Sequence, residues 1–356
     1  MKITNEIVED KAKKLGFDLV GFAKAEILEE ESFRLEEWLN KNYQGGMKYM
    51  ERNIDKRKDI RKVFPEAKSV ISLALNYYTP AQHSVGNIHE QPDNSDLSSN
   101  NAYVQKSPSK HLLRKAGPQK GKSDYPAGQT NLQSGKLSRY AWGKDYHLIM
   151  WNKLEILERQ LSEIDPEFKS LSYVDTGPVM DKVWAVRAGL GWQGKHTNII
   201  NPEIGSWFFI ATIITNYEFG ESKLITDHCG SCTACIEACP TNAIIDEYVV
   251  DSNKCISYLT IENKSEIPKE FKGKFDGWMF GCDICQDVCP WNIKFSEVCD
   301  IAEFSPAGGE TEISLESIKE MDDKIFKKRF AESPIKRTKL KGLKRNADFL
   351  MTEEKP

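Results

Sequence analysis

The sequence predicts an α+β protein in which a domain of mixed helices and strands precedes a small cysteine-rich domain. Over the first 225 residues, segments with helical periodicity alternate irregularly with short apolar runs typical of strands. All nine cysteines then fall between positions 229 and 299. A chain of 356 residues has room for about two domains. We therefore expect domains at residues 1–225 and 226–300, followed by a basic segment over residues 301–356.

The first part of the larger domain is expected to contain two helices and two strands. Apolar residues recur at helical spacing over residues 3–15, which end at Gly16, and again over residues 29–40. Residues 18–23 are typical of a short strand. The continuous apolar run over residues 70–75 predicts a strand that is buried on both faces.

Residues 81–134 differ in character from the rest of this domain. They are rich in Ser, Asn, Gln, Pro, Gly and Lys, and contain few large apolar residues. Such a composition cannot bury enough apolar surface to offset the entropy of ordering, so a disordered insertion is expected. After it, helices are predicted at residues 146–163 and 179–188, and strands at 172–176 and 207–214.

Eight cysteines follow the spacing of a bacterial ferredoxin with two 4Fe–4S clusters. The first run is C-x2-C-x2-C-x3-C-P, and the second is a lone cysteine followed by C-x2-C-x3-C-P. Three cysteines of one run can bind one cluster, while the cysteine before the proline binds the other. This crossover predicts one cluster on Cys229, Cys232, Cys235 and Cys289, and a second on Cys239, Cys255, Cys282 and Cys285.

Two other uses of clustered cysteines compete with iron–sulfur clusters. Structural zinc also binds CxxC pairs, but it has no use for a third cysteine at the same spacing or for the Cys-Pro endings. Disulfides are disfavoured because the chain shows no signal peptide, which predicts a cytoplasmic protein whose thiols stay reduced. No apolar run approaches the roughly 20 residues of a membrane span. Cys299 fits neither run and is expected to be a spare thiol.

Three short motifs resemble signatures of other functions, and each departs from its signature at an essential position. Gly189–Gly194 matches G-x-G-x-x-G but follows a helical segment, and His196 replaces the Ser or Thr of a P-loop. Asp175-Thr-Gly copies an aspartic-protease triplet, but no second triplet exists, which leaves a helix or turn cap and a catalytic carboxylate as alternatives. His147 lies in a near match to a cobalt-ligand motif whose glycine is Met150, so we expect a packing or hydrogen-bonding residue.

The charge of the chain is unevenly distributed. Its formal net charge is -4, yet ten Lys or Arg residues and one acid, Glu332, lie between Lys324 and Arg345. This run suggests a local anionic partner, with a solvated helix face as the alternative.

Taken together, segments spread along the chain resemble the epoxyqueuosine reductases, cobalamin-dependent enzymes of queuosine synthesis. The resemblance covers nearly the whole chain except residues 81–134. The resembling segments are Arg139–His147, Val174–Pro178, Arg187–Lys195, Ile200–Trp207, Asp227–Cys232, Cys255–Thr260, Gly281–Gln286, Cys289–Asn292 and Ser333–Arg337.

The resemblance implies a fold, a cofactor and a substrate. The first domain would be nitroreductase-like, as in the cobalamin-binding core of reductive dehalogenases. Base-off cobalamin would lie between this core and the cluster domain, without a protein ligand to cobalt. The substrate would be epoxyqueuosine at the wobble position of tRNAs for Asp, Asn, His and Tyr, which loses its epoxide oxygen as water. The enzyme would be a cytoplasmic monomer that binds the tRNA anticodon loop and takes electrons from a reduced donor.

The resemblance also implies roles for individual residues. Asp175 matches the proton donor of the family. Ser138 departs from relatives with cysteine at this position, so that side chain is not expected to ligate cobalt. By motif position, the cobalamin contacts would be Arg57, Ser138, Asp175, Ile199, Ile210, Ser257 and Asp283. Phosphate contacts to tRNA are expected at Lys264, Lys336, Arg337 and Lys339, because the chain ends before the helical repeats that some relatives carry.

Two rival functions share some of these features. A respiratory reductive dehalogenase would carry a twin-arginine export signal, which this sequence lacks. An electron-transfer ferredoxin subunit would account for the cysteines and for nothing upstream of them.

Overall fold

The structure, a computed structural model, describes residues 2–80 and 133–352. Its largest sheet is four-stranded and antiparallel, in the order β1-β2-β7-β4. These strands lie close to the four that the sequence predicted. Their bounds are β1 Leu19–Lys24, β2 Ser69–Asn76, β7 Phe208–Thr215 and β4 Ser170–Tyr173.

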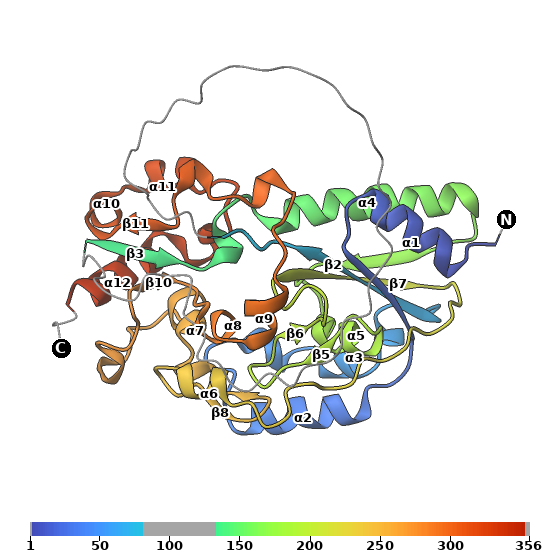
Figure 1. Ribbon diagram of the computed structural model, residues 1–356, viewed down its shortest axis with the longest axis horizontal. Helices are drawn as coiled ribbons and strands as arrows, with labels where there is room; N and C mark the ends of the chain where they lie inside the picture. The colour runs from blue at the N-terminus through green and yellow to red at the C-terminus, as the bar shows by residue number, and fades with distance from the viewer. Residues whose placement is uncertain (1, 81–132, 353–356) are drawn as a thin grey trace, which may run out of the picture.

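Helices cover both faces of this sheet (Figure 1). Side chains alternate between the faces of a strand, so Ile71 and Leu73 of β2 pack with α1 and α4, whereas Val70 and Ala74 pack with α5. In Figure 1, α2 and α3 lie on the same side as α5. The bounds are α1 Asn5–Lys14, α2 Glu29–Asn40, α3 Ile54–Lys58, α4 Tyr146–Ile164 and α5 Asp181–Arg187.

A second sheet joins segments that are far apart in the sequence. The strand β3 pairs in parallel with β10 and antiparallel with β11. Ser134, which the sequence placed in the insertion, is the first residue of β3, whereas residues 81–132 of that expected insertion lie outside the described residues. The bounds are β3 Ser134–Leu137, β10 Trp278–Phe280 and β11 Glu312–Ser314.

The segment that was expected only from its basic charge packs into a core that it shares with the second sheet and the cysteine-rich region. Leu343, Ala347 and Leu350 of α12 are buried together with residues of β10 and α7. The domain boundaries expected at residues 225 and 300, and the assignment of the first domain to the nitroreductase-like fold, stay predictions. The helices of this region are α7 Ile256–Ile261, α10 Leu315–Glu320, α11 Asp323–Arg329 and α12 Lys339–Met351.

The cysteine-bearing loops carry short helices and hairpins between the two sheets (Figure 1). The glycine-rich motif over residues 189–194, which departs from nucleotide-binding signatures, contains the first strand of the hairpin β5–β6. Among the described residues, no helix has the length and apolarity needed to cross a membrane. The remaining bounds are β5 Trp192–Gln193, β6 Ile199–Ile200, α6 Ala234–Ala238, β8 Ile244–Asp246, β9 Val249–Val250, α8 Ile284–Asp287 and α9 Pro290–Phe295.

A buried ionic network centred on Arg139 holds the cysteine loops against the large sheet. The Arg139 guanidinium lies 3.8 Å from Asp283 and 3.3 Å from Asp287, and its Nε donates to the carbonyl of Thr79 at 2.9 Å. The backbone N–H of Arg139 and the hydroxyl of Ser138 donate to Asp283. Arg139 is 1% exposed, so this charge is compensated by protein groups rather than by water.

The network predicts that Arg139→Leu destabilises the fold strongly. Removing the cation leaves Asp283 and Asp287 buried without their charge partner, which costs about 3–5 kcal/mol. Urea unfolding followed by tryptophan fluorescence measures the loss. The control is Arg329→Leu, because the pair of Arg329 with Glu310 is largely exposed and its removal costs at most about 1 kcal/mol. Equal stability of the two variants would contradict the role of the network.

Candidate functional site

The structure places Cys229, Cys232 and Cys235 of the first run near the distant Cys289. Burial raises the pKa of the Cys235 thiol to about 12, and the nearby thiols of Cys289, Cys229 and Cys232 contribute to this rise. The same neighbours, Cys229 and Cys232, act on Cys289. This is the first group that the crossover predicts, although ligation itself stays a prediction.

The remaining four cysteines form the second predicted group. Burial raises the pKa of Cys285 well above its usual value, and the thiols of Cys255, Cys235 and Cys239 add to the shift. The pKa of Cys282 is raised by burial and then by Cys285 and Cys255. The influence of Cys235 on Cys285 shows that the two groups are neighbours.

The donor set of each group fits an iron–sulfur cluster. Buried thiolates repel one another unless cationic iron lies among them, so metal binding would release their protons. Among the described residues, no three His, Cys, Asp or Glu side chains are arranged to hold a metal ion. A cubane cluster presents a different iron to each thiolate, so its ligands do not converge on one ion. Cys299 packs on the core of the large sheet instead, where its sulfur accepts from the N–H of Ile301.

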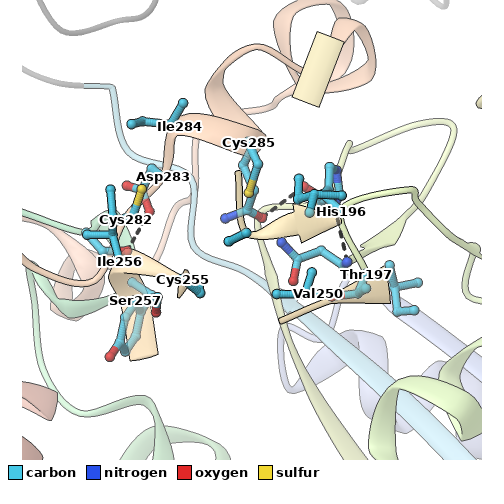
Figure 2. A pocket seen from close by; sticks show the side chains of 18 of the residues that line it. His196, Thr197, Val250, Cys255, Ile256, Ser257, Cys282, Asp283, Ile284 and Cys285 are labelled. Atoms are coloured by element: carbon cyan, nitrogen blue, oxygen red, sulfur yellow. Dashed lines mark hydrogen bonds between the residues drawn. The ribbon is translucent and has the colours of Figure 1, made fainter. Parts of the chain in front are cut away.

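A pocket with a volume of about 490 Å³ lies between the large sheet, the β5–β6 hairpin and the cysteine loops (Figure 2). The second cysteine group forms part of its wall. Six of the seven predicted cobalamin contacts also line it: Ser138, Asp175, Ile199, Ile210, Ser257 and Asp283.

The structure does not bring Arg57 into this lining. Arg57 is 8% exposed, and its Nη2 donates to the carbonyl of Tyr49 at 3.4 Å. Burial raises the pKa of the pocket residue Asp181, and the charge of Arg57 is among the groups that oppose this rise, so Arg57 lies near the pocket without lining it.

Asp175 lies on the loop after β4, in a left-handed conformation with φ 51°. The sequence placed it in a strand-like segment, but β4 ends at Tyr173. Its carboxylate accepts a hydrogen bond from the hydroxyl of Tyr146 at 3.1 Å. The Tyr146 ring stacks on Phe209 with centroids 4.1 Å apart, so the hydroxyl that contacts Asp175 is held by a rigid side chain.

Sequence reasoning missed Tyr146 as a functional residue. Burial, and then the charge of Asp175, raise the pKa of Tyr146, so its hydroxyl remains a proton donor to the carboxylate. A position in an amphipathic helix is equally typical of a core residue, and no local sequence signal distinguishes a functional tyrosine from a core tyrosine here.

Besides Asp175 and Asp283, the pocket holds a third carboxyl group, Asp181, which the sequence did not indicate. Burial raises the pKa of Asp181 to about 7, and the charge of Asp175 adds to the shift, while a 2.6 Å hydrogen bond from Thr212 opposes it. Asp181 can therefore hold a proton close to neutral pH. An acid in the first turn of a helix is ordinarily read as favourable to the helix dipole, which hides such a role.

A second cavity of about 780 Å³ adjoins the first and shares Tyr140, Tyr146 and Asp175 with it. Lys336 and Arg337, two of the predicted tRNA contacts, line this second cavity. They come from the short 3-10 helix Pro334–Thr338.

Both cations already have acidic partners. The Lys336 ammonium lies 2.9 Å from Asp145, and Arg337 pairs with Glu262. Although burial alone would raise it, hydrogen bonds from His147 and Lys336 lower the pKa of Asp145 to about 2. His147 is thus a hydrogen-bonding residue, as expected, with its Nδ1 2.8 Å from Asp145.

The other two predicted tRNA contacts do not line either cavity. The Lys264 ammonium donates to the carbonyl of Ile261 at 3.2 Å. Lys339 begins α12, next to the turn that carries Lys336 and Arg337.

Two family models match parts of the chain. One is described as a 4Fe-4S double cluster binding domain and matches residues 228–292. The other is described as epoxyqueuosine reductase QueG, DUF1730, and matches residues 118–176. This second match begins inside the expected insertion, so residues from 118 onward are shared with the family model, although 118–132 lie outside the described residues.

Similar proteins cover nearly the whole chain. An epoxyqueuosine reductase of Cellulophaga algicola is 43% identical over 97% of this chain and 97% of its own length. One from Synechocystis is 40% identical over 90% of this chain and 94% of its own length. A crystal structure of epoxyqueuosine reductase with an epoxyqueuosine-modified stem loop of tRNA-Tyr has a TM-score of 0.79 and 29% identity, covering 97% of this chain and 80% of that one. The chain therefore belongs to the epoxyqueuosine reductases, a family of oxidoreductases, as the motifs along its sequence predicted.

Proposed function

We propose that this chain reduces epoxyqueuosine at the wobble position of tRNAs for Asp, Asn, His and Tyr, using base-off cobalamin and two 4Fe–4S clusters. One observation carries the proposal. A single pocket is walled by four of the cluster cysteines and by Asp175, and it adjoins a second cavity lined by basic residues. Electron supply, proton supply and substrate access thus meet in one place.

The lining of the first pocket fits a corrin. Ile199, Ile210 and Phe208 supply apolar contact area, while Ser138 and Ser257 supply hydroxyl groups for polar substituents. His147, the near match to a cobalt-ligand motif, is not part of this lining, which supports cobalamin bound without that histidine as a ligand. When bound, cobalamin supplies a strongly reducing centre that reconciles single-electron donors with a two-electron reaction.

The chain's own residues supply the proton and the orientation. Removal of the epoxide breaks two C–O bonds, forms a C=C bond and releases water, which consumes two electrons and two protons. Asp175 would protonate the departing oxygen, and the Tyr146 hydroxyl, which donates a hydrogen bond to its carboxylate, would position it. Ligands that fill both cavities would exclude water from Asp175.

The partners follow from the same arrangement. Lys264, Lys336, Arg337 and Lys339 would contact phosphates of the anticodon loop, whose splayed bases allow one base to enter the second cavity. We propose a cytoplasmic monomer that receives its electrons from a reduced donor and passes them through the first cysteine group to the second.

The ligand assignment predicts different outcomes for two cysteine variants. Cys235→Ser should lower the iron and sulfide content below about eight of each per chain, because it removes a ligand of the first cluster. Cys299→Ser is the matched control and should leave both contents unchanged. Iron and sulfide analysis of anaerobically purified protein decides, and loss of iron in the Cys299 variant would refute the assignment.

The proton-donor role predicts that Asp175→Asn lowers turnover by about 10²–10⁴-fold, because Asn keeps the shape but has no transferable proton. Single-turnover conversion of epoxyqueuosine tRNA under a strong chemical reductant measures this without the natural donor. Cobalamin and iron contents of the variant serve as controls. Near-normal conversion would exclude Asp175 as the proton donor and make Asp181 the candidate for that role.

The proposed phosphate-binding residues predict a change in the salt dependence of tRNA binding. Replacing Lys336, Arg337 and Lys339 with Gln should weaken tRNA binding and flatten the slope of log K against log salt by about 0.7 for each phosphate that the variant no longer neutralises. The matched control neutralises Lys324, Lys327 and Lys328 on α11, which line neither cavity. Equal effects of the two triple variants on affinity and slope would show that phosphate binding is not local to the site.

A further inference from the structure

The β5–β6 hairpin presents a buried histidine to the first pocket. His196 is 4% exposed and lines the pocket. Figure 2 shows it across the cavity from Cys255, Ser257 and Asp283. Its Nε2 is buried and has no hydrogen-bond partner among the described residues. A buried polar atom without a partner is costly, so this atom indicates a ligand group that contacts it.

The hydrogen bonds of His196 determine which nitrogen carries the proton. The backbone N–H of Asn198 donates to Nδ1 at 3.1 Å, which makes Nδ1 an acceptor. Burial, and then the charge of Lys182, lower the pKa of His196 to about 4, so the ring is neutral near pH 7. The neutral ring therefore carries its proton on Nε2. A protonated Nε2 donates a hydrogen bond and cannot ligate a metal.

The hairpin is built so that the imidazole fits at this point. A Cβ at Gly194 would lie 3.1 Å from Cε1 of His196 and 2.6 Å from Cδ1 of Ile200. The next residue, Thr197, has a φ of 67°, and the Lys182 ammonium ties the turn through the carbonyl of Thr197 at 3.2 Å. A side chain at Gly194 would therefore crowd both Ile200 and the imidazole ring, and glycine avoids this.

We propose that His196 donates a hydrogen bond from Nε2 to an amide carbonyl oxygen at the edge of the corrin. The identity of the ligand rests on the proposed function. The periphery of a corrin carries several amide side chains, and a neutral donor in a buried site pairs with a neutral acceptor without burying a charge. This gives His196 a part in cofactor binding that is separate from proton or electron transfer.

Two variants of His196 test the proposal through cobalamin binding rather than through activity. His196→Phe keeps a planar ring but removes the donor, and we expect hydroxocobalamin to bind about tenfold more weakly. His196→Gln retains an N–H group near the position of Nε2 and should recover most of the affinity. Both variants lose the Nδ1 acceptor of the ring; His196→Phe keeps the planar shape without a donor, and His196→Gln keeps an N–H donor without the ring. Equilibrium dialysis gives the Kd, and iron content with the urea midpoint verifies that both variants fold.

The outcomes separate this proposal from the proposed function. If the wild-type protein does not bind hydroxocobalamin, the assignment of cobalamin as the cofactor is refuted, and with it the proposed ligand of His196. Binding by wild type with equal affinity in both variants, whether unchanged or equally weakened, would overturn the donor role alone. The electron paramagnetic resonance spectrum of bound cob(II)alamin gives a further test. A nitrogen splitting that disappears in His196→Phe would show that His196 ligates cobalt, and would also overturn the donor role.

Discussion

The buried ion pairs of Arg139 with Asp283 and Asp287 are the constraint on which the rest of the structure depends. Arg139 follows β3, and both acids belong to the loop and helix that carry Cys282 and Cys285. The guanidinium also stacks on Trp207, 4.4 Å from the ring centroid, just before β7. One desolvated charge therefore fixes the cysteine loop, the large sheet and the second sheet relative to one another. The pocket lies where these three parts meet, and further hydrogen bonds of Ser206 with Asn292 and Gln286 join the same loops to the segment before β7.

In this geometry, the groups proposed for electron transfer and for proton transfer lie in different walls of the pocket. The second cysteine group lines one part of the pocket, so electrons can reach it without a mobile carrier. Asp175 and Tyr146 lie where the pocket meets the second cavity. Under the proposed function, the proton donor would therefore lie where the substrate enters. A two-electron, two-proton reduction needs both supplies at one centre, and under the proposed function the cysteine group and Asp175 would provide them from different parts of the chain.

The cysteine groups and the large sheet were predictable because their signals are local. The spacing of the cysteines predicts the two 4Fe–4S clusters, and a continuous apolar run such as that of β2 predicts a buried strand. The strand β3 was not predictable, since Ser134–Leu137 has no apolar alternation and its partner Trp278 lies far along the chain. The proposed roles of Tyr146 and His196 were missed for a related reason. Both depend on contacts made only in the fold, with Asp175 and with the turn at Asn198.

The central claim is that cobalamin lies beside the second cysteine group. Electron paramagnetic resonance of the anaerobically purified protein, loaded with cob(II)alamin and then reduced until the clusters become paramagnetic, tests it most directly. The account predicts a base-off cob(II)alamin spectrum without nitrogen splitting, which broadens through magnetic coupling once the neighbouring cluster is reduced. A base-on spectrum, or a cobalt signal unaffected by cluster reduction, would contradict it.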